Sequence, residues 1–151
     1  MIDDERMKAF SFGKYNDRKI EQSQVAKLKE SLVENGVQWF NHKNFLPLLV
    51  PTADFIEPSS YSKDITLGPN LPELKLSAKG SEEYRKYIWA SGQHRVNALI
   101  DYHKDLRADI EKLQTRREAE NLTSDELPNI ILQISRLEGE LQSTRYWGVA
   151  I

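Results

Sequence analysis

The segment Ser91-Gly92-Gln93-His94-Arg95 carries the residue types best suited to chemistry in this sequence. An apolar run precedes it and helical spacing follows it, so we expect a strand that turns into a helix. The start of a helix offers free backbone N–H groups and the positive end of the helix dipole, which together favour an anion such as phosphate. His94 and Arg95 add donors, and the arginine fork matches phosphate geometry. The segment predicts a site for a nucleotide or another phosphorylated ligand.

Three strands are expected around this turn. One covers Phe45–Val50, where Pro47 favours an edge or a bulge. The second is Lys86–Ala90, which leads directly into the turn. The third is Arg145–Ile151, and because the chain stops within it, we expect the sequence to be a domain excised from a longer protein.

A helix is predicted ahead of the first strand, with Ser23 as its N-cap and Gly36 as its stop after Asn35. Four apolar residues at helical spacing form its predicted core face: Val25, Leu28, Leu32 and Val33. A separate polar stripe at i, i+3 and i+7 consists of Gln24, Lys27 and Ser31. Composition alone favours a solvated surface for this stripe.

A long helical hairpin over about residues 107–143 is predicted to follow the turn. The helix that starts near Gln93 carries a heptad seam of Leu99, His103, Leu106, Ile110 and Leu113. Thr123 and Glu126 form a capping box for the return helix, whose apolar face is Ile130, Ile134, Leu137 and Leu141. We interpret His103 as a seam residue and not as a ligand. The alternating charges of the hairpin indicate first a solvated surface and second a surface for a partner.

The remaining segments carry weaker patterns. Residues 1–22 show no strong period, although Phe10, Phe12 and Tyr15 suit a short strand or a packed arm, and Asn16-Asp17-Arg18 reads as a turn. Residues 56–85 are polar and rich in Pro and Gly, which predicts a long loop.

Composition excludes several classes of function. The net charge is −2, from 21 basic and 23 acidic side chains, so the overall charge gives no drive toward DNA or an anionic membrane. The chain has no cysteine and only three well-separated histidines, so disulfides, thiolate catalysis and a protein-built metal site lack support. No apolar stretch approaches the ~20 residues of a membrane span, and no secretory signal is evident. We therefore expect a single intracellular domain, cytoplasmic or nuclear, over residues 1–151.

The order of these elements resembles the ParB/sulfiredoxin superfamily. The corresponding turn reads Gly-Glu-Arg-Arg in ParB proteins, Gly-Gly-Cys-His-Arg in sulfiredoxin and Gly-His-His-Arg in the free serine kinases, against Gly92-Gln93-His94-Arg95 here. The similarity covers roughly residues 15–50, 85–106 and the last strand. It implies an α+β fold, a small mixed sheet with packed helices, into which the long helical hairpin is inserted.

The resemblance implies a nucleotide site. Phosphates would lie at the turn and the start of its helix, and the polar stripe of the first helix would form a facing wall, with Arg18 and its neighbours near the sugar or base. The implied binding residues are Gln24, Lys27, Ser31, Ser91, Gly92, Gln93, His94, Arg95 and Arg18. The nucleotide, ATP, ADP or CTP, would come with Mg²⁺ held mainly by its phosphates. The resemblance also has a limit, because Gln93 replaces the sulfiredoxin nucleophile and excludes sulfinic-acid reduction.

Two functions follow, alongside a purely structural interpretation in which the turn only caps and pairs locally. The first is hydrolysis of a nucleotide or transfer of a phosphoryl group, with Glu21 or Asp17 as the candidate base. The alternative is a ParB-like module switched by a nucleotide, without catalysis. In that module the hairpin would bind a protein or DNA or mediate self-association.

Overall fold

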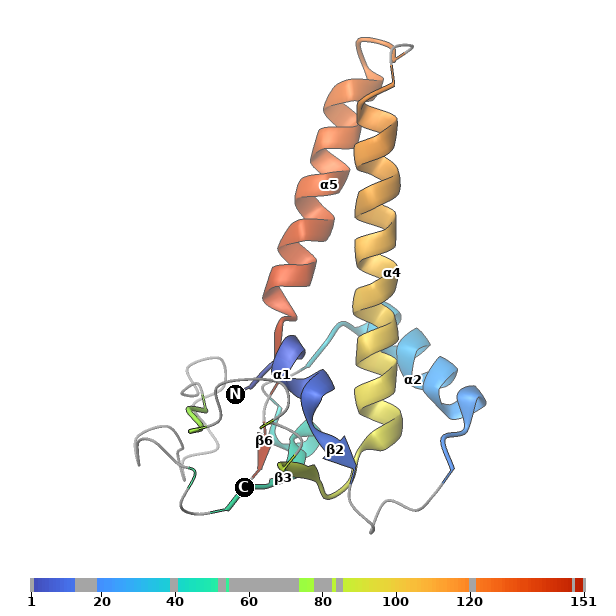
Figure 1. The fold of residues 1–151 in the computed structure, drawn as a ribbon. Coiled ribbons are helices and arrows are strands. Elements are labelled where there is room, and N and C mark those ends of the chain that lie inside the picture. Colours follow the sequence, from blue (N-terminus) through green and yellow to red (C-terminus); the bar gives the residue numbers. More distant parts are fainter. Residues whose placement is uncertain are drawn as a thin grey trace.

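The computed structural model describes residues 2–12, 19–38, 41–51, 54, 74–77, 83, 86–119, 122–147 and 149–150. They form a mixed α+β structure in which a small body carries one long helical hairpin (Figure 1). The hairpin extends well beyond the body, and both chain ends lie on the body (Figure 1). The predicted α+β class and the projecting hairpin are confirmed.

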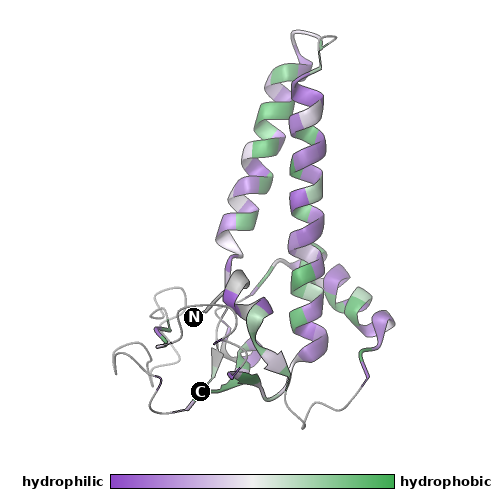
Figure 2. Ribbon diagram, in the orientation of Figure 1, coloured by the Kyte–Doolittle hydropathy of each residue, from purple (hydrophilic) through white to green (hydrophobic). Residues whose placement is uncertain are grey.

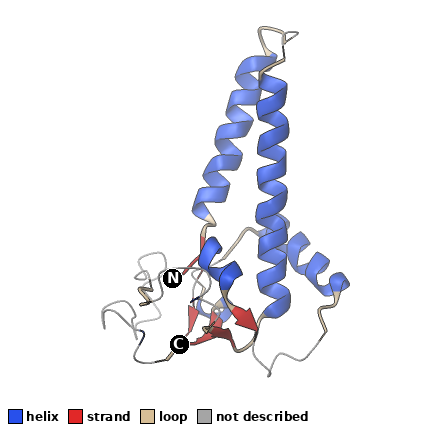
Figure 3. Ribbon diagram, in the orientation of Figure 1, coloured by secondary structure: helices blue, strands red, loops and turns tan. Residues whose placement is uncertain are grey.

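The strands are short and form two sheets (Figure 3). Their bounds are β1 Ile2–Asp3, β2 Ser11–Phe12, β3 Leu46–Leu49, β4 Ile88–Trp89, β5 Tyr146–Trp147 and β6 Val149–Ala150. The larger sheet has the order β2-β4-β3-β6, in which β4 runs parallel to β2 and antiparallel to β3, and β3 runs parallel to β6. The antiparallel pair β1-β5 stands beside it. The sheet is therefore mixed, as expected.

The described part of the chain has four α-helices and one 3₁₀ turn. They are α1 Asp4–Ala9, α2 Gln22–Asn35, α4 Gln93–Arg117 and α5 Glu126–Ser143, with a 3₁₀ turn at His42–Asn44. Helix α2 packs against α4, and α5 packs against α4 to form the hairpin. Of the described helices, none is long and apolar enough to cross a bilayer.

Four sequence predictions need correction. Helix α2 begins before Ser23, at an N-cap position held by Glu21 without a side-chain cap bond. Val33 is 65% exposed, because the face of α2 that meets α4 runs through Val25 instead. The predicted final strand is two strands, since β5 pairs with β1 whereas β6 pairs with β3. In the first segment β2 confirms the short strand expected near Phe12, but β1 and α1, which are too short to show a period, were not predicted.

The core forms where the lower half of α4 covers the sheet. It gathers aromatic and branched side chains from every part of the chain: Phe10, Leu46, Leu48, Leu74, Leu76, Tyr87, Trp89, Val96, Leu99, Tyr102, Leu106 and Trp147. Trp89 on the central strand β4 is fully buried, and the rings of Phe10 and Trp89 lie 5.3 Å apart. Closing this core requires segments that are distant in sequence, and it fixes where α4 begins.

The upper half of α4 packs on α5. Ile110 of α4 and Ile130 and Ile134 of α5 are buried, which confirms the predicted seam. Hydrophobic and hydrophilic residues alternate along both helices (Figure 2). At the base of the hairpin His103 is fully buried, and its Nε2 lies 3.0 Å from the Thr144 hydroxyl. His103 therefore has the structural place in the seam that we predicted.

Candidate functional site

The turn into α4 requires a glycine. Gly92 is the N-cap and has a left-handed backbone with φ +89°. A Cβ atom at this position would lie 2.6 Å from Cδ2 of Leu46, a side chain that is itself only 1% exposed. Glycine is the residue that adopts this φ without strain. The turn is thereby pressed against β3, and this contact sets the direction of α4.

The start of α4 presents backbone donors. The N–H of Val96 donates to the Gly92 carbonyl at 2.9 Å, the first bond of the helix. In the described part of the chain, no hydrogen bond uses the backbone N–H groups of Gln93, His94 and Arg95. Helix starts leave such groups for a capping group, water or an anion. The predicted strand-to-helix geometry is present, although β4 covers only Ile88–Trp89, so it begins two residues later and ends one residue earlier than predicted.

The ring of His94 joins the starts of two helices. Its Nε2 accepts a hydrogen bond of 3.0 Å from the backbone N–H of Glu21, the N-cap of α2. Nε2 is then the unprotonated nitrogen, and Nδ1 carries the proton of the neutral ring. Further along helices α2 and α4, Nζ of Lys29 lies 2.8 Å from the carboxylate of Asp105. This hydrogen bond raises the pKa of Lys29. Helices α2 and α4 therefore run side by side with both N-termini at one end.

Arg95, the residue after His94, contacts the 3₁₀ turn and not the start of α2. One guanidinium nitrogen donates to the backbone carbonyl of Asn44 at 3.0 Å. The indole N–H of the buried Trp147 donates to the same carbonyl at 2.9 Å. A guanidinium has five N–H donors, so this contact orients Arg95 and leaves most of its donors for something else. The 3₁₀ turn that supplies Asn44 thus positions the cation.

Arg95 lines a cavity of about 350 Å³ between α2, the 3₁₀ turn and β5. The residues around it are Leu28, Ser31, Leu32, Asn35, Gly36, Gln38, Asn44, Arg95 and Trp147. Asn35 donates to the Ser31 hydroxyl at 3.2 Å, and Asn44 donates to the Gln38 carbonyl at 3.3 Å, so the polar wall is internally bonded. These lining residues include one cation and no carboxylate. The volume falls in the usual range of small-ligand pockets.

The structure divides the predicted site residues into groups. Ser31 and Arg95 meet at the cavity, whereas His94 faces the start of α2 with Glu21. Gln24 and Lys27 are exposed on α2 and do not line the cavity.

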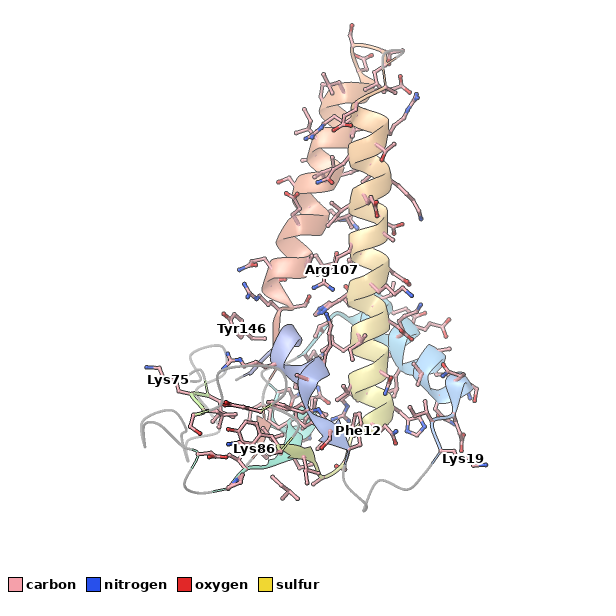
Figure 4. The ribbon with its side chains drawn as sticks, viewed as in Figure 1. Phe12, Lys19, Lys75, Lys86, Arg107 and Tyr146 are labelled. Atoms are coloured by element: carbon pink, nitrogen blue, oxygen red, sulfur yellow. The ribbon has the colours of Figure 1, made fainter. Side chains whose placement is uncertain are left out.

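Ser91 and Gln93, two further predicted site residues, lie at the start of α4. Ser91 is exposed in the turn, and Gln93 opens α4 with its carbonyl accepting a 2.8 Å bond from Asn97. The exposed side chain of Lys19 lies just ahead of α2 (Figure 4). Asp17, Arg18 and the turn around them lie outside the described residues, as does most of the predicted 56–85 loop.

Several cavity residues were not predicted from the sequence. The sequence predicts Asn35 only as the last residue of a helix, and it predicts no role at a site for Gln38, Asn44 or Trp147. Asn44 contributes its backbone carbonyl, a group that every residue has, so its residue type does not indicate this role. The pair Asn35-Gly36 carried a usable signal, because a helix that ends on an amide beside a predicted polar stripe extends that stripe by one turn.

No group of three or more His, Asp or Glu side chains in the described segments could hold a metal ion. Comparisons with protein-family models, with curated proteins and with solved structures gave no significant match to the chain. The resemblance to the ParB/sulfiredoxin superfamily accordingly stays a prediction.

Proposed function

We propose that this protein binds a nucleotide or a related phosphorylated ligand where α4 begins. The observation that carries the proposal is Arg95, an arginine that lines a cavity without a carboxylate and uses one donor on the Asn44 carbonyl. Phosphate oxygens accept from such a fork and from the backbone N–H groups of the same helix turn. The resemblance of the turn to the ParB/sulfiredoxin superfamily supports the same ligand class.

The proposed arrangement gives each residue a distinct task. Arg95 would neutralise phosphate charge, and the N–H groups at the start of α4 would bind the oxygens that face the helix axis. His94 would donate from Nδ1, because its Nε2 already accepts from Glu21. The Ser31 hydroxyl and the amides of Asn35 and Gln38 would contact the ligand's polar edges inside the cavity. Asp17 and Arg18 retain their predicted roles as proposals.

Phosphoryl transfer or hydrolysis is the extension of this proposal. It needs a base that orients the attacking group, and Glu21 is the described candidate, exposed at the start of α2 and bonded through its backbone to His94. The Mg²⁺ predicted to accompany the nucleotide would be held mainly by its phosphates, and we assign no catalytic step to it. The nucleotide-switched binding module is the second candidate, and the exposed apolar residues of α5 favour it.

Titration calorimetry of the chain with ATP, ADP, CTP and GTP tests binding directly. We expect heat with at least one nucleotide, loss of binding in Arg95→Ala, and partial retention in Arg95→Lys, which keeps the charge but not the fork. Arg117→Ala at the far end of α4 is the matched control and should bind like the unaltered chain. Absence of heat with all four nucleotides would refute the proposal.

A thermal shift distinguishes lost binding from lost folding. Circular dichroism should show that Arg95→Ala remains folded. A ligand present at 100 times its Kd should raise the stability of the unaltered chain by about 2.7 kcal/mol and leave that variant unchanged. If Arg95→Ala is stabilised as much as the unaltered chain, Arg95 is not the phosphate-binding residue.

A further inference from the structure

Exposed apolar side chains gather on one part of α5. Six large hydrophobic residues are exposed in the described part of the chain, and three of them fall within six consecutive positions of this helix. Leu127 is 41% exposed, Ile131 50% and Leu132 69%, and Pro128 between them is also exposed. We call Pro128, Ile131 and Leu132 the outer face of α5. Singly exposed apolar residues are ordinary, but a cluster of them marks an interaction surface.

The outer face does not belong to the hairpin seam. Ile130 and Ile134 are buried against α4, and Leu127, seven residues before Ile134, lies in the same row of α5. With 3.6 residues per turn, Pro128 and Leu132 lie on the side of α5 away from this row, and Ile131 lies at its flank. The hairpin projects away from the body, so no described part of the body reaches this side (Figure 1). The seam therefore does not account for the apolar character of these positions.

Two charged side chains extend the same side of the helix. Asp125, Leu132 and Arg136 stand at i, i+7 and i+11, which places them in one row along α5. Asp125 and Arg136 are exposed, and neither is ion-paired in the described part of the chain. The apolar row is thus bounded by an acid at one end and a base at the other.

We propose that the outer face of α5 binds the same face of a second copy of this chain, with the two helices antiparallel. A two-fold axis beside Ile131 sets Ile131 against its own symmetry mate and Leu132 against the partner's Pro128. The same register sets Arg136 against the partner's Asp125 on both sides of the axis. A parallel arrangement would instead bring like charges together, so the charges select the antiparallel one. The result is a four-helix arrangement of two hairpins.

Sedimentation equilibrium of the full chain over a wide concentration range tests the dimer. We expect a monomer–dimer equilibrium that Leu132→Glu weakens about 100-fold, because each dimer then buries two unpaired charges in place of two leucines. Val33→Glu is the matched control: Val33 is 65% exposed on α2, away from the outer face, and its change should leave the equilibrium unaltered. A chain that stays monomeric throughout refutes the proposal, as does a dimer that Leu132→Glu leaves intact.

A charge exchange tests the antiparallel register. Arg136→Glu alone should weaken the dimer, and combining it with Asp125→Arg should restore it. Failure of the double variant to recover association would overturn the register.

Cross-linking identifies the axis. The chain has no cysteine, so Ile131→Cys introduces a single thiol that should join two copies through a short bis-maleimide. Val33→Cys should give no covalent dimer. Equal cross-linking of both variants would indicate random collision and would count against the proposed interface.

Discussion

The body and the hairpin share helix α4 but are stabilised by different kinds of contact. The lower half of α4 is buried under side chains from distant segments, including Phe10, Trp89 and Trp147. The upper half packs on α5, its neighbour along the chain. Contacts distant in sequence must form together, whereas a hairpin seam repeats a local pattern. We therefore expect substitutions in the body to affect the whole fold and the site, and those in the hairpin to remain local.

The largest expected effect comes from removing core volume beneath α4. Leu99 is 2% exposed in the body, and Leu99→Ala should lower the free energy of unfolding by about 3 kcal/mol. Ile130→Ala in the hairpin is the paired variant and should cost about 2 kcal/mol, because the seam near its tip can close over the gap. Urea denaturation followed by circular dichroism measures both. Equal losses, or a larger loss in Ile130→Ala, would contradict the distinction.

A substitution in the turn at Gly92 should lower the free energy of unfolding nearly as much, and it should also weaken ligand binding. Gly92→Ala places a Cβ against Leu46 and forces a left-handed φ on a non-glycine residue. We expect a loss of about 2 kcal/mol and, at temperatures where the variant is folded, weaker nucleotide binding. Gly139→Ala in α5 has open space around it and should be neutral or stabilising. Unfolding curves and calorimetry on both variants give the comparison, and an unaffected Gly92→Ala would refute the role of the turn.

The junction between the two regions should give an intermediate effect. The hydroxyl of Tyr102 donates to the Glu140 carboxylate, and burial of the ring raises the pKa of Tyr102 well above its usual value. Tyr102→Phe removes this bond, and we expect a cost of about 1.5 kcal/mol. Hydrogen exchange should show the loss at the base of α5 with little change in β4. Uniform destabilisation of the body would mean that the junction is part of the core and not a separate connection.

The smallest expected effect lies at the hairpin tip and depends on pH. Thr123 and Glu126 form the predicted capping box, in which the Thr123 N–H donates to the Glu126 carboxylate at 2.8 Å and the Glu126 N–H to the Thr123 hydroxyl at 3.3 Å. The first of these bonds keeps the pKa of Glu126 below its ordinary 4.5. Its contribution is therefore present above that pH and is lost as the pH falls through the lowered pKa.

Thr123→Ala should cost about 0.5–1 kcal/mol at neutral pH. Glu126→Gln should lose the pH dependence that the unaltered chain shows below pH ~4.5. Thermal melts at neutral and acidic pH compare the three chains. A pH dependence that persists unchanged in Glu126→Gln would assign it to other carboxylates.

The hairpin was the part of the fold most open to prediction. Heptad spacing from Leu99 to Ile110, a capping box and a seam on the return helix are local signals, and the structure has all three. The two halves of the final run could not be separated in the same way. Tyr146 and Val149 belong to different sheets because β5 pairs with β1 whereas β6 pairs with β3. These pairings depend on the tertiary structure and leave no local signal in the sequence.

The turn of the candidate site could be predicted from the sequence, whereas the residues that line its cavity mostly could not. Gly92 and Arg95 stand out by residue type, since a glycine between a strand and a helix and an arginine one turn later have a physical reason to be there. Asn44 has none, because its carbonyl is common to all residues and only folding brings it to Arg95. The pairing of His94 with the Glu21 N–H likewise depends on how α2 lies against α4.

The Asn44 carbonyl also gives the molecule an optical property. It accepts from both Arg95 and the indole of Trp147, so a ligand that draws the guanidinium away changes the electrostatic field at a single tryptophan ring. Indole emission follows such fields, and the ring is only 2% exposed, which shields it from quenchers in the buffer. Occupancy of the cavity would then be readable from the intrinsic fluorescence of the unlabelled chain.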